Sequence, residues 1–159
     1  AVAVAPAAAE PAGEEDPPIG SESGLPLPRY VSLETSEGNA RRGPGRGHRI
    51  DWVFVREGMP LLITAEYGQW RRVEDRDGEG GWIQYSLLSG TRTVIVDRPM
   101  LPLRSRPDER APETALAEAG VVARIEECGP DWCRIGAGGL RGWAPKDALW
   151  GVGADEILD

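Results

Sequence analysis

The chain has 159 residues, a formal net charge of −8 and two cysteines. It contains no apolar run of about 18 residues, so we expect no membrane-spanning helix. The acidic excess lies in the two terminal segments, and between residues 29 and 152 acidic and basic residues are equal in number. A neutral body without a basic stripe argues against nucleic acid as a partner.

Residues 1–28 consist mainly of Ala, Pro, Glu and Gly. Such a composition offers little apolar surface to bury and predicts a disordered leader. The chain begins with an Ala-rich segment instead of Met, which is typical of an exported protein whose signal peptide has been removed. A cytosolic protein with a trimmed N-terminus is the alternative.

Residues 70–88 and 132–149 repeat one pattern. Trp70 and Trp82 are twelve residues apart, Trp132 and Trp143 are eleven apart, and a Leu follows each second Trp six residues later. Internal repetition of this length predicts two similar small domains.

Each repeat alternates apolar and polar residues on both sides of Gly-rich and Asp-rich turns, which predicts a three-stranded meander. A single helical turn follows at residues 86–88 and again at 146–149, with 3₁₀ geometry expected. Residues 91–96 and 150–152 are candidates for the closing strands. The predicted boundaries are therefore 29–96 for the first domain, 97–152 for the second and 153–159 for an acidic tail.

Short strands, a long Gly/Pro loop and one helical turn are features of a small, strongly bent barrel. In the first repeat they occur at residues 39–44, 70–73, 81–83 and 86–88, and in the second at 103–107, 132–135, 142–145 and Leu149. This order resembles the bacterial SH3-like domain family of exported envelope proteins. The resemblance implies an all-β protein with two tandem SH3-like β-barrels. The loop that follows residues 103–107 is predicted to be shorter than its counterpart.

The arginine loop, residues 41–49, is the first candidate binding site. It contains Arg41, Arg42, Arg46 and Arg49, together with His48. Guanidinium groups bind carboxylates in pairs, and both peptidoglycan stem peptides and acidic glycans carry carboxylates. The alternative is a solvated loop whose arginines pair with nearby acids for little gain. His48 alone is interpreted as a loop residue.

Trp52 and Tyr85 are the candidates for an aromatic floor beside the arginine loop, because each borders a loop. Such a ring would support a sugar or a peptide. Packing in the core or at its edge is the competing interpretation for both rings.

Cys128 and Cys133 flank a four-residue turn and lie within reach of a disulfide. Closing so small a loop would stabilise the second domain by roughly 2 kcal/mol. Free thiols are the alternative. The only histidine, His48, belongs to the other repeat, so we expect no metal site and no cofactor. A disulfide favours an oxidising compartment and therefore a periplasmic or otherwise exported protein.

These observations predict a binding or scaffold module without catalytic residues, which recognises cell-wall peptide or an envelope protein. A cell-wall peptidase would need Cys with His, or metal ligands, and His48 lies in a different repeat from the cysteines. Two other hypotheses are an accessory protein for a cell-wall hydrolase and a structural envelope adaptor without a small ligand. An exposed apolar patch around Trp150 would favour the adaptor.

Overall fold

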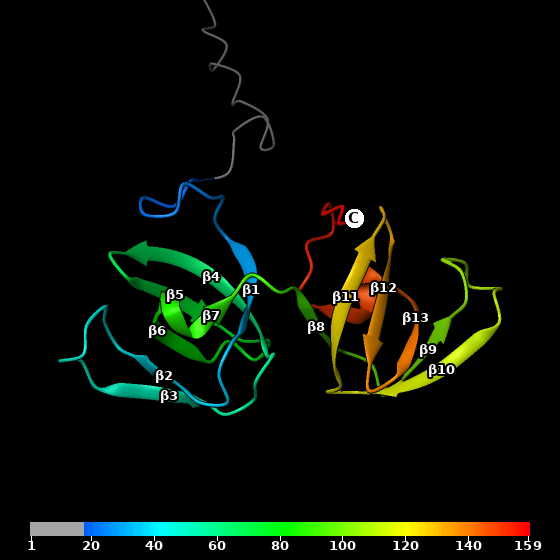
Figure 1. Cartoon of the computed structure of the whole chain (residues 1–159), viewed down its shortest axis with the longest axis horizontal. Coiled ribbons are helices and arrows are strands. Elements are labelled where there is room, and N and C mark those ends of the chain that lie inside the picture. Colours follow the sequence, from blue (N-terminus) through cyan, green and yellow to red (C-terminus); the bar gives the residue numbers. More distant parts are fainter. Residues whose placement is uncertain (1–17) are drawn as a thin grey trace, which may run out of the picture.

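The computed structural model describes residues 18–159, which form two small β-barrels joined by a short connector (Figure 1). Each barrel is one bent, antiparallel seven-stranded sheet. Helical structure in this part of the chain is limited to two 3₁₀ turns. The predicted all-β fold with two tandem barrels is confirmed. Among residues 18–159 there is no helix with the length and apolar character needed to span a membrane.

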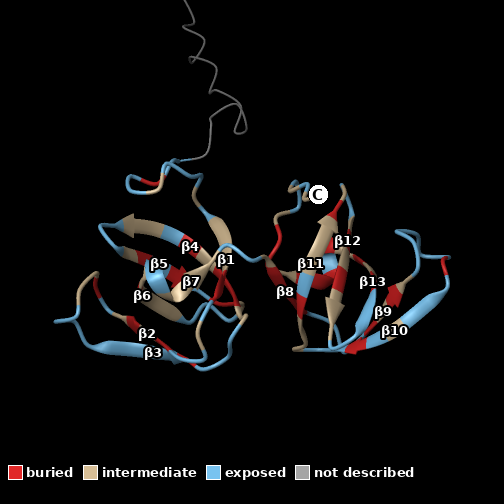
Figure 2. Ribbon diagram, in the orientation of Figure 1, coloured by how far each residue is buried: buried red, intermediate tan, exposed pale blue. Residues whose placement is uncertain are grey.

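Barrel 1 has the strand order β3-β2-β6-β5-β4-β1-β7. Its elements are β1 (Arg29–Leu33), β2 (Gly38–Arg41), β3 (Ile50–Phe54), β4 (Pro60–Tyr67), β5 (Trp70–Glu74), β6 (Gly80–Gln84), η1 (Tyr85–Leu87) and β7 (Leu88–Ser89). Alternate residues of these strands turn inward and build the core (Figure 2). The core side chains are Leu33, Ala40, Phe54, Leu61, Ile63, Val73 and Ile83.

Barrel 2 has the equivalent order β10-β9-β13-β12-β11-β8-β14. Its elements are β8 (Thr93–Val96), β9 (Met100–Arg104), β10 (Glu113–Glu118), β11 (Val122–Cys128), β12 (Trp132–Ala137), β13 (Leu140–Pro145), η2 (Lys146–Ala148) and β14 (Leu149–Trp150). Its core contains more alanines than that of barrel 1. They are Ala117, Ala123, Ala144 and Ala148.

The two repeats share one hydrogen-bonding register. Arg41 faces Trp82 between β2 and β6, and Arg104 faces Trp143 between β9 and β13. The pairing of β4 with β5 shifts after Ile63, and the pairing of β11 with β12 shifts at the matching place. Residues of the two barrels can therefore be equated by register.

The predicted closing strand of barrel 1, at residues 91–96, is wrong. It contains β8, which pairs with β11 and β14 and so opens barrel 2. All four residues of β8 are buried. A continuous apolar run predicts a buried strand but does not indicate which sheet buries it. The expected domain boundary between residues 96 and 97 therefore assigns β8 to barrel 1, whereas β8 pairs with strands of barrel 2.

Both terminal segments dock on the barrels, which differs from the expected disorder of residues 18–23 and solvation of the tail. Residues 24–28 are too Pro-rich for a helix or a central strand, which predicts that they lie extended across barrel 1, and Leu27 packs against its core. The strap, residues 18–28, folds back on itself through the bridge between Ile19 and Pro26. The tail, residues 153–159, pairs with β11 through Leu158 and Cys128. Composition predicts disorder from the segment alone, whereas these contacts depend on distant partners. The expectation for residues 1–17 lies outside the described residues.

The barrels contact each other through aromatic and polar groups. The rings of Tyr30 and Trp150 meet edge to face with centroids 5.3 Å apart. The Thr93 hydroxyl donates to the carbonyl of Gly58 at 2.6 Å, and a guanidinium nitrogen of Arg56 donates to the carbonyl of Gly120 at 2.8 Å. Trp150 thus packs at the junction between the two barrels.

Candidate functional site

The arginine loop connects β2 to β3 and closes through its own backbone. The N–H of Arg42 donates to the carbonyl of Arg49 at 3.0 Å, and the N–H of His48 donates to the carbonyl of Gly45 at 3.2 Å. The His48 ring covers Gly43, where a Cβ atom would lie 2.6 Å from its Cε1 atom. His48 therefore packs the loop, as expected of a loop residue.

Three of the four predicted arginines make contacts within the loop region. One guanidinium nitrogen of Arg41 donates to the carbonyls of Arg46 and His48, at 3.2 and 2.9 Å. Arg42 and Arg49 share the carboxylate of Asp51, at 3.4 and 2.8 Å. The hydrogen bond from Arg49 lowers the pKa of the Asp51 carboxyl. Arg41 thus braces the loop through its hydrogen bonds to backbone carbonyls. The single negative charge of Asp51 balances one of the two positive charges of Arg42 and Arg49.

Groove 1 lies between the arginine loop and β5, with a volume of about 360 Å³. Its lining residues are Glu37, Asn39, Arg41, Arg46, Trp70, Gln84 and Leu87. Arg46 is exposed, and in the described part of the chain its guanidinium has no hydrogen-bond or ion-pair partner. Groove 1 therefore combines one braced arginine, one unengaged arginine and an indole ring with a single carboxylate, that of Glu37.

The two predicted aromatic candidates do not line groove 1. Trp52 lies on β3 with 39% of its surface exposed. Tyr85 begins η1 and lines a different pocket, where the guanidinium of Arg71 lies 5.5 Å from its ring centroid. Trp70 is the ring that flanks groove 1, and the sequence interpretation assigned it no binding role. The available signal in the sequence was its repetition as Trp132 in the second repeat.

The equivalent loop of barrel 2 has the same length, so the predicted shortening is wrong. The N–H of Ser105 donates to the carbonyl of Pro112 at 2.9 Å, as Arg42 does to Arg49. Arg104 donates to the carbonyl of Ala111 at 3.0 Å, as Arg41 does to His48. The second repeat is instead shorter in the connection between β10 and β11.

Groove 2 overlaps the corresponding place in barrel 2 and has a volume of about 400 Å³. Its residues Glu109, Trp132 and Pro145 match Arg46, Trp70 and Gln84 of groove 1 by register. Groove 2 is lined by Glu109, Pro130, Asp131, Trp132, Pro145, Lys146, Asp147, Val152 and Ala154. By register Glu109 stands where barrel 1 has Arg46. The Lys146 ammonium group donates to two backbone carbonyls, those of Ala154 at 3.1 Å and Glu156 at 2.5 Å. Groove 2 thus has the opposite charge character to groove 1.

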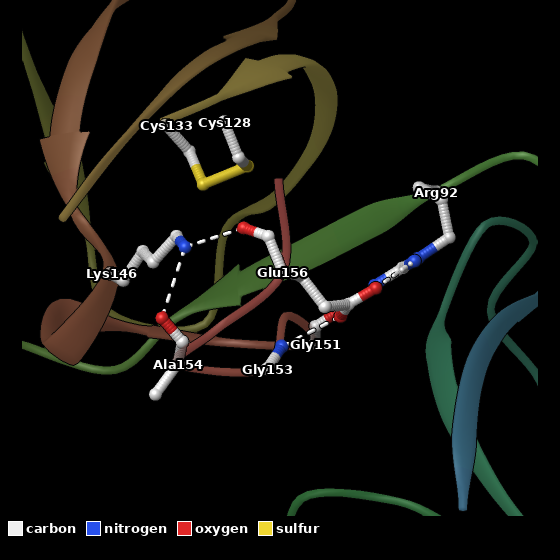
Figure 3. The surroundings of a disulfide bond; sticks show 8 residues. All are labelled: Arg92, Cys128, Cys133, Lys146, Gly151, Gly153, Ala154 and Glu156. Atoms are coloured by element: carbon white, nitrogen blue, oxygen red, sulfur yellow. Dashed lines mark hydrogen bonds and ion pairs between the residues drawn. A yellow bond between two sulfur atoms is a disulfide. The ribbon is translucent and has the colours of Figure 1, made fainter. Parts of the chain in front are cut away.

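The predicted disulfide between Cys128 and Cys133 is present (Figure 3). The two residues face each other at the β11–β12 turn, with Cα atoms 4.1 Å apart. At the same register barrel 1 has Glu66 and Arg71, whose carboxylate oxygen and guanidinium nitrogen lie 3.4 Å apart. Residues 18–159 contain no cluster of three metal-binding side chains.

Comparison with protein families gives two matches to the bacterial SH3 domain, at residues 34–90 and 97–151. Curated proteins give no significant match. Comparison with solved structures gives matches that include NlpC1 and NlpC2 from Trichomonas vaginalis, both 17% identical. NlpC1 covers 82% of this chain with a TM-score of 0.37, and NlpC2 covers 77% with 0.36. The chain spans 48% of each of those proteins. Because the family matches cover more than half of its length, the chain belongs to the bacterial SH3 domain family and carries two tandem copies of the domain.

Proposed function

We propose that this protein is a non-catalytic binding module of the bacterial cell envelope that recognises carboxylate groups of cell-wall peptide through groove 1. The observation that carries this proposal is the unengaged guanidinium of Arg46, which lies beside Arg41 and Trp70 in one groove. An exposed arginine fork binds a carboxylate through charge-assisted hydrogen bonds. The guanidinium group of Arg41 supplies a second positive charge, and its hydrogen bonds to backbone carbonyls hold it in place in the absence of a ligand.

The rest of groove 1 suits a peptide. The side-chain amides of Asn39 and Gln84 can donate to peptide carbonyls and accept from peptide N–H groups. Trp70 offers an apolar surface against which an aliphatic or sugar segment can lie. Groove 2 has carboxylates at its rim, including Glu109, and would repel an anionic ligand. Only barrel 1 is therefore proposed to bind cell-wall carboxylates.

A non-catalytic, exported role is the proposal that best fits the remaining chemistry. Cys128 and Cys133 are bonded to each other, so neither sulfur is a free nucleophile. His48 covers Gly43 within the loop. A structural disulfide persists in oxidising compartments, which supports a periplasmic or otherwise exported location.

Co-sedimentation of the oxidised protein with purified peptidoglycan sacculi, at low and physiological salt, tests the proposal. The wild-type protein is expected to pellet with sacculi. Arg46→Glu, and more completely Arg42→Glu with Arg46→Glu, are expected to remain in the supernatant. Arg110→Glu is the matched control, since it makes the same charge change on the equivalent loop of barrel 2 and is expected to pellet normally.

Failure of the wild-type protein to pellet would overturn wall recognition through groove 1 and would direct attention to a protein partner. Equal loss of pelleting in Arg46→Glu and Arg110→Glu would show that only net charge matters, and would remove the assigned role of groove 1. Glu109→Arg provides the reciprocal experiment, because it replaces a carboxylate of groove 2 with the guanidinium group that groove 1 has at the matching position, and it is expected to increase the amount of protein that pellets.

A further inference from the structure

Barrel 1 has a second hollow, the strap pocket, on the side where residues 18–28 cross the barrel. It has a volume of about 380 Å³, and its walls are mainly apolar. The strap contributes Ser23 and Leu25 to it, and η1 contributes Tyr85. The remaining lining residues come from β1, β4, β5 and the segment after η1, namely Arg29, Tyr30, Val31, Ile63, Arg71, Leu88, Ser89 and Gly90.

The two charged side chains that line the strap pocket are both arginines, Arg29 and Arg71. The carboxylate of Glu66, whose side chain is fully buried, lies 2.8 Å from a guanidinium nitrogen of Arg29 and 3.4 Å from one of Arg71. The same carboxylate accepts the backbone N–H groups of Glu22 and Ser23, at 3.1 and 2.9 Å. The Glu66 carboxylate is therefore shared by the guanidinium groups of Arg29 and Arg71. It also holds the strap through two backbone hydrogen bonds.

In barrel 2 the equivalent place is filled by the protein's own tail. Arg92 corresponds by register to Arg29, since Arg29 pairs with Ile63 and the carbonyl of Arg92 accepts the N–H of Ile125. The two terminal nitrogens of Arg92 donate hydrogen bonds to the two oxygens of the Glu156 carboxylate, each at 2.7 Å (Figure 3). The tail residue Glu156 thus pairs with Arg92, which is the arginine of barrel 2 that matches Arg29.

Two further contacts extend this correspondence. Lys146 begins η2 as Tyr85 begins η1. Its ammonium group donates hydrogen bonds to the carbonyls of Ala154 and Glu156 in the tail (Figure 3). Leu158 exchanges backbone hydrogen bonds with Cys128, which stands at the register of Glu66, and packs against the core of barrel 2. In barrel 1 the strap reaches only the Glu66 end of this place, so among residues 18–159 the rest of it, lined by Tyr30, Leu88 and Gly90, is left as the strap pocket.

We infer that the strap pocket is a second binding site, which takes an extended peptide carrying a glutamate or aspartate next to an aliphatic residue, supplied by a partner protein. The peptide carboxylate would meet the guanidinium groups of Arg29 and Arg71, as Glu156 meets Arg92. The aliphatic side chain would lie between Leu25 and Tyr85, both half exposed. This site is separate from groove 1 and does not depend on the function proposed for it.

The test uses the full-length protein and a fluorescein-labelled heptapeptide with the sequence of residues 153–159. Fluorescence anisotropy is expected to show saturable binding with a dissociation constant below about 1 mM. The peptide carrying Glu156→Gln is expected to bind about tenfold more weakly, because it loses the charge-assisted hydrogen bonds. Absence of saturable binding at about 1 mM, or equal binding of both peptides, would overturn the inference.

Gly90 allows a site-specific variant. A Cβ atom there meets nothing within 4 Å, and its φ is outside the left-handed region. Gly90→Glu brings a carboxylate to the pocket and is expected to weaken binding about tenfold relative to Gly90→Gln. Gly47→Glu, at an equally open position in the arginine loop, is expected to leave peptide binding unchanged. If Gly90→Glu binds like Gly90→Gln, the peptide sits elsewhere, for example in place of the tail, and the inference fails.

Discussion

The two barrels share a backbone but differ in the charge of their grooves. The loop after β2 and the loop after β9 have the same length and the same internal hydrogen bonds, and each is braced by an equivalent arginine, Arg41 or Arg104. At the position that faces the groove, barrel 1 has Arg46 and barrel 2 has Glu109. A common loop conformation therefore supports opposite binding chemistry, so family membership alone does not predict the ligand of either copy.

The barrels also differ in what holds them together. At three matching core positions barrel 1 has large side chains and barrel 2 has alanines. The pairs are Phe54 and Ala117, Leu61 and Ala123, and Ile83 and Ala144. Barrel 2 has a disulfide where barrel 1 has a buried ion pair. We therefore expect the large side chains at these three positions to contribute more to stability than the matching alanines, and the cross-link to stabilise barrel 2 alone.

The largest expected effect is that of Phe54→Ala. Phe54 is buried, and removing its ring leaves a cavity that should lower the free energy of unfolding by about 3 to 5 kcal/mol. Ala117→Gly, at the matching position of barrel 2, should cost about 1 kcal/mol. Urea denaturation followed by tryptophan fluorescence measures both. Equal losses at the two positions would contradict the proposed difference between the cores.

Glu66→Gln should remove about 3 kcal/mol of stability and much of its dependence on acidic pH. Burial alone raises the pKa of Glu66, but hydrogen bonds from Ser23, Arg29 and Glu22 outweigh it and lower the pKa from 4.5 to about 2. This stabilisation is present above pH 4.5 and is lost as the pH falls towards 2. Urea midpoints measured from pH 6 to 2 test it, with the exposed Glu57→Gln as the control. A wild-type profile that is flat across this range would contradict the prediction.

Replacing both cysteines by serine should lower the free energy of unfolding by about 2 kcal/mol, as expected for so small a loop. The effect belongs to barrel 2, because Cys128 and Cys133 lie at the end of its core. Calorimetry of the wild-type protein with and without a reductant, beside the double variant, measures it. The reductant should have no effect on the variant. A fall in melting temperature of the variant on reduction would show that the loss has another origin.

The smallest expected effect is that of Gly43→Ala, at about 1 kcal/mol. The added Cβ would press on the ring of His48, whereas the matching pair of barrel 2 is Arg106 and Ala111, which has no ring to displace. His48→Ala should therefore relieve the cost of Gly43→Ala in a double-mutant cycle. Additive losses in that cycle would indicate that the glycine is needed for another reason.

Local patterns predicted what neighbours in the chain can decide. The turn between Cys128 and Cys133 fixes their pairing, and the helical turns follow directly from the strands before them. The alternation in residues 70–74 is enough to predict a strand. The arginine loop was identified from its composition, but Arg46 could not be separated from Arg41, because bracing by backbone carbonyls depends on how the loop closes.

The repeat, the all-β class, the family and the disulfide could therefore be predicted from the sequence alone. Each of these depends on a short spacing or a period of two residues. Tertiary structure decided that β8 belongs to barrel 2, that Tyr85 faces the strap instead of the arginine loop, and that Glu66 holds residues 18–28 in place. These outcomes require partners about 30 to 60 residues away in the chain, and the composition of a short segment does not indicate which distant residues it will contact.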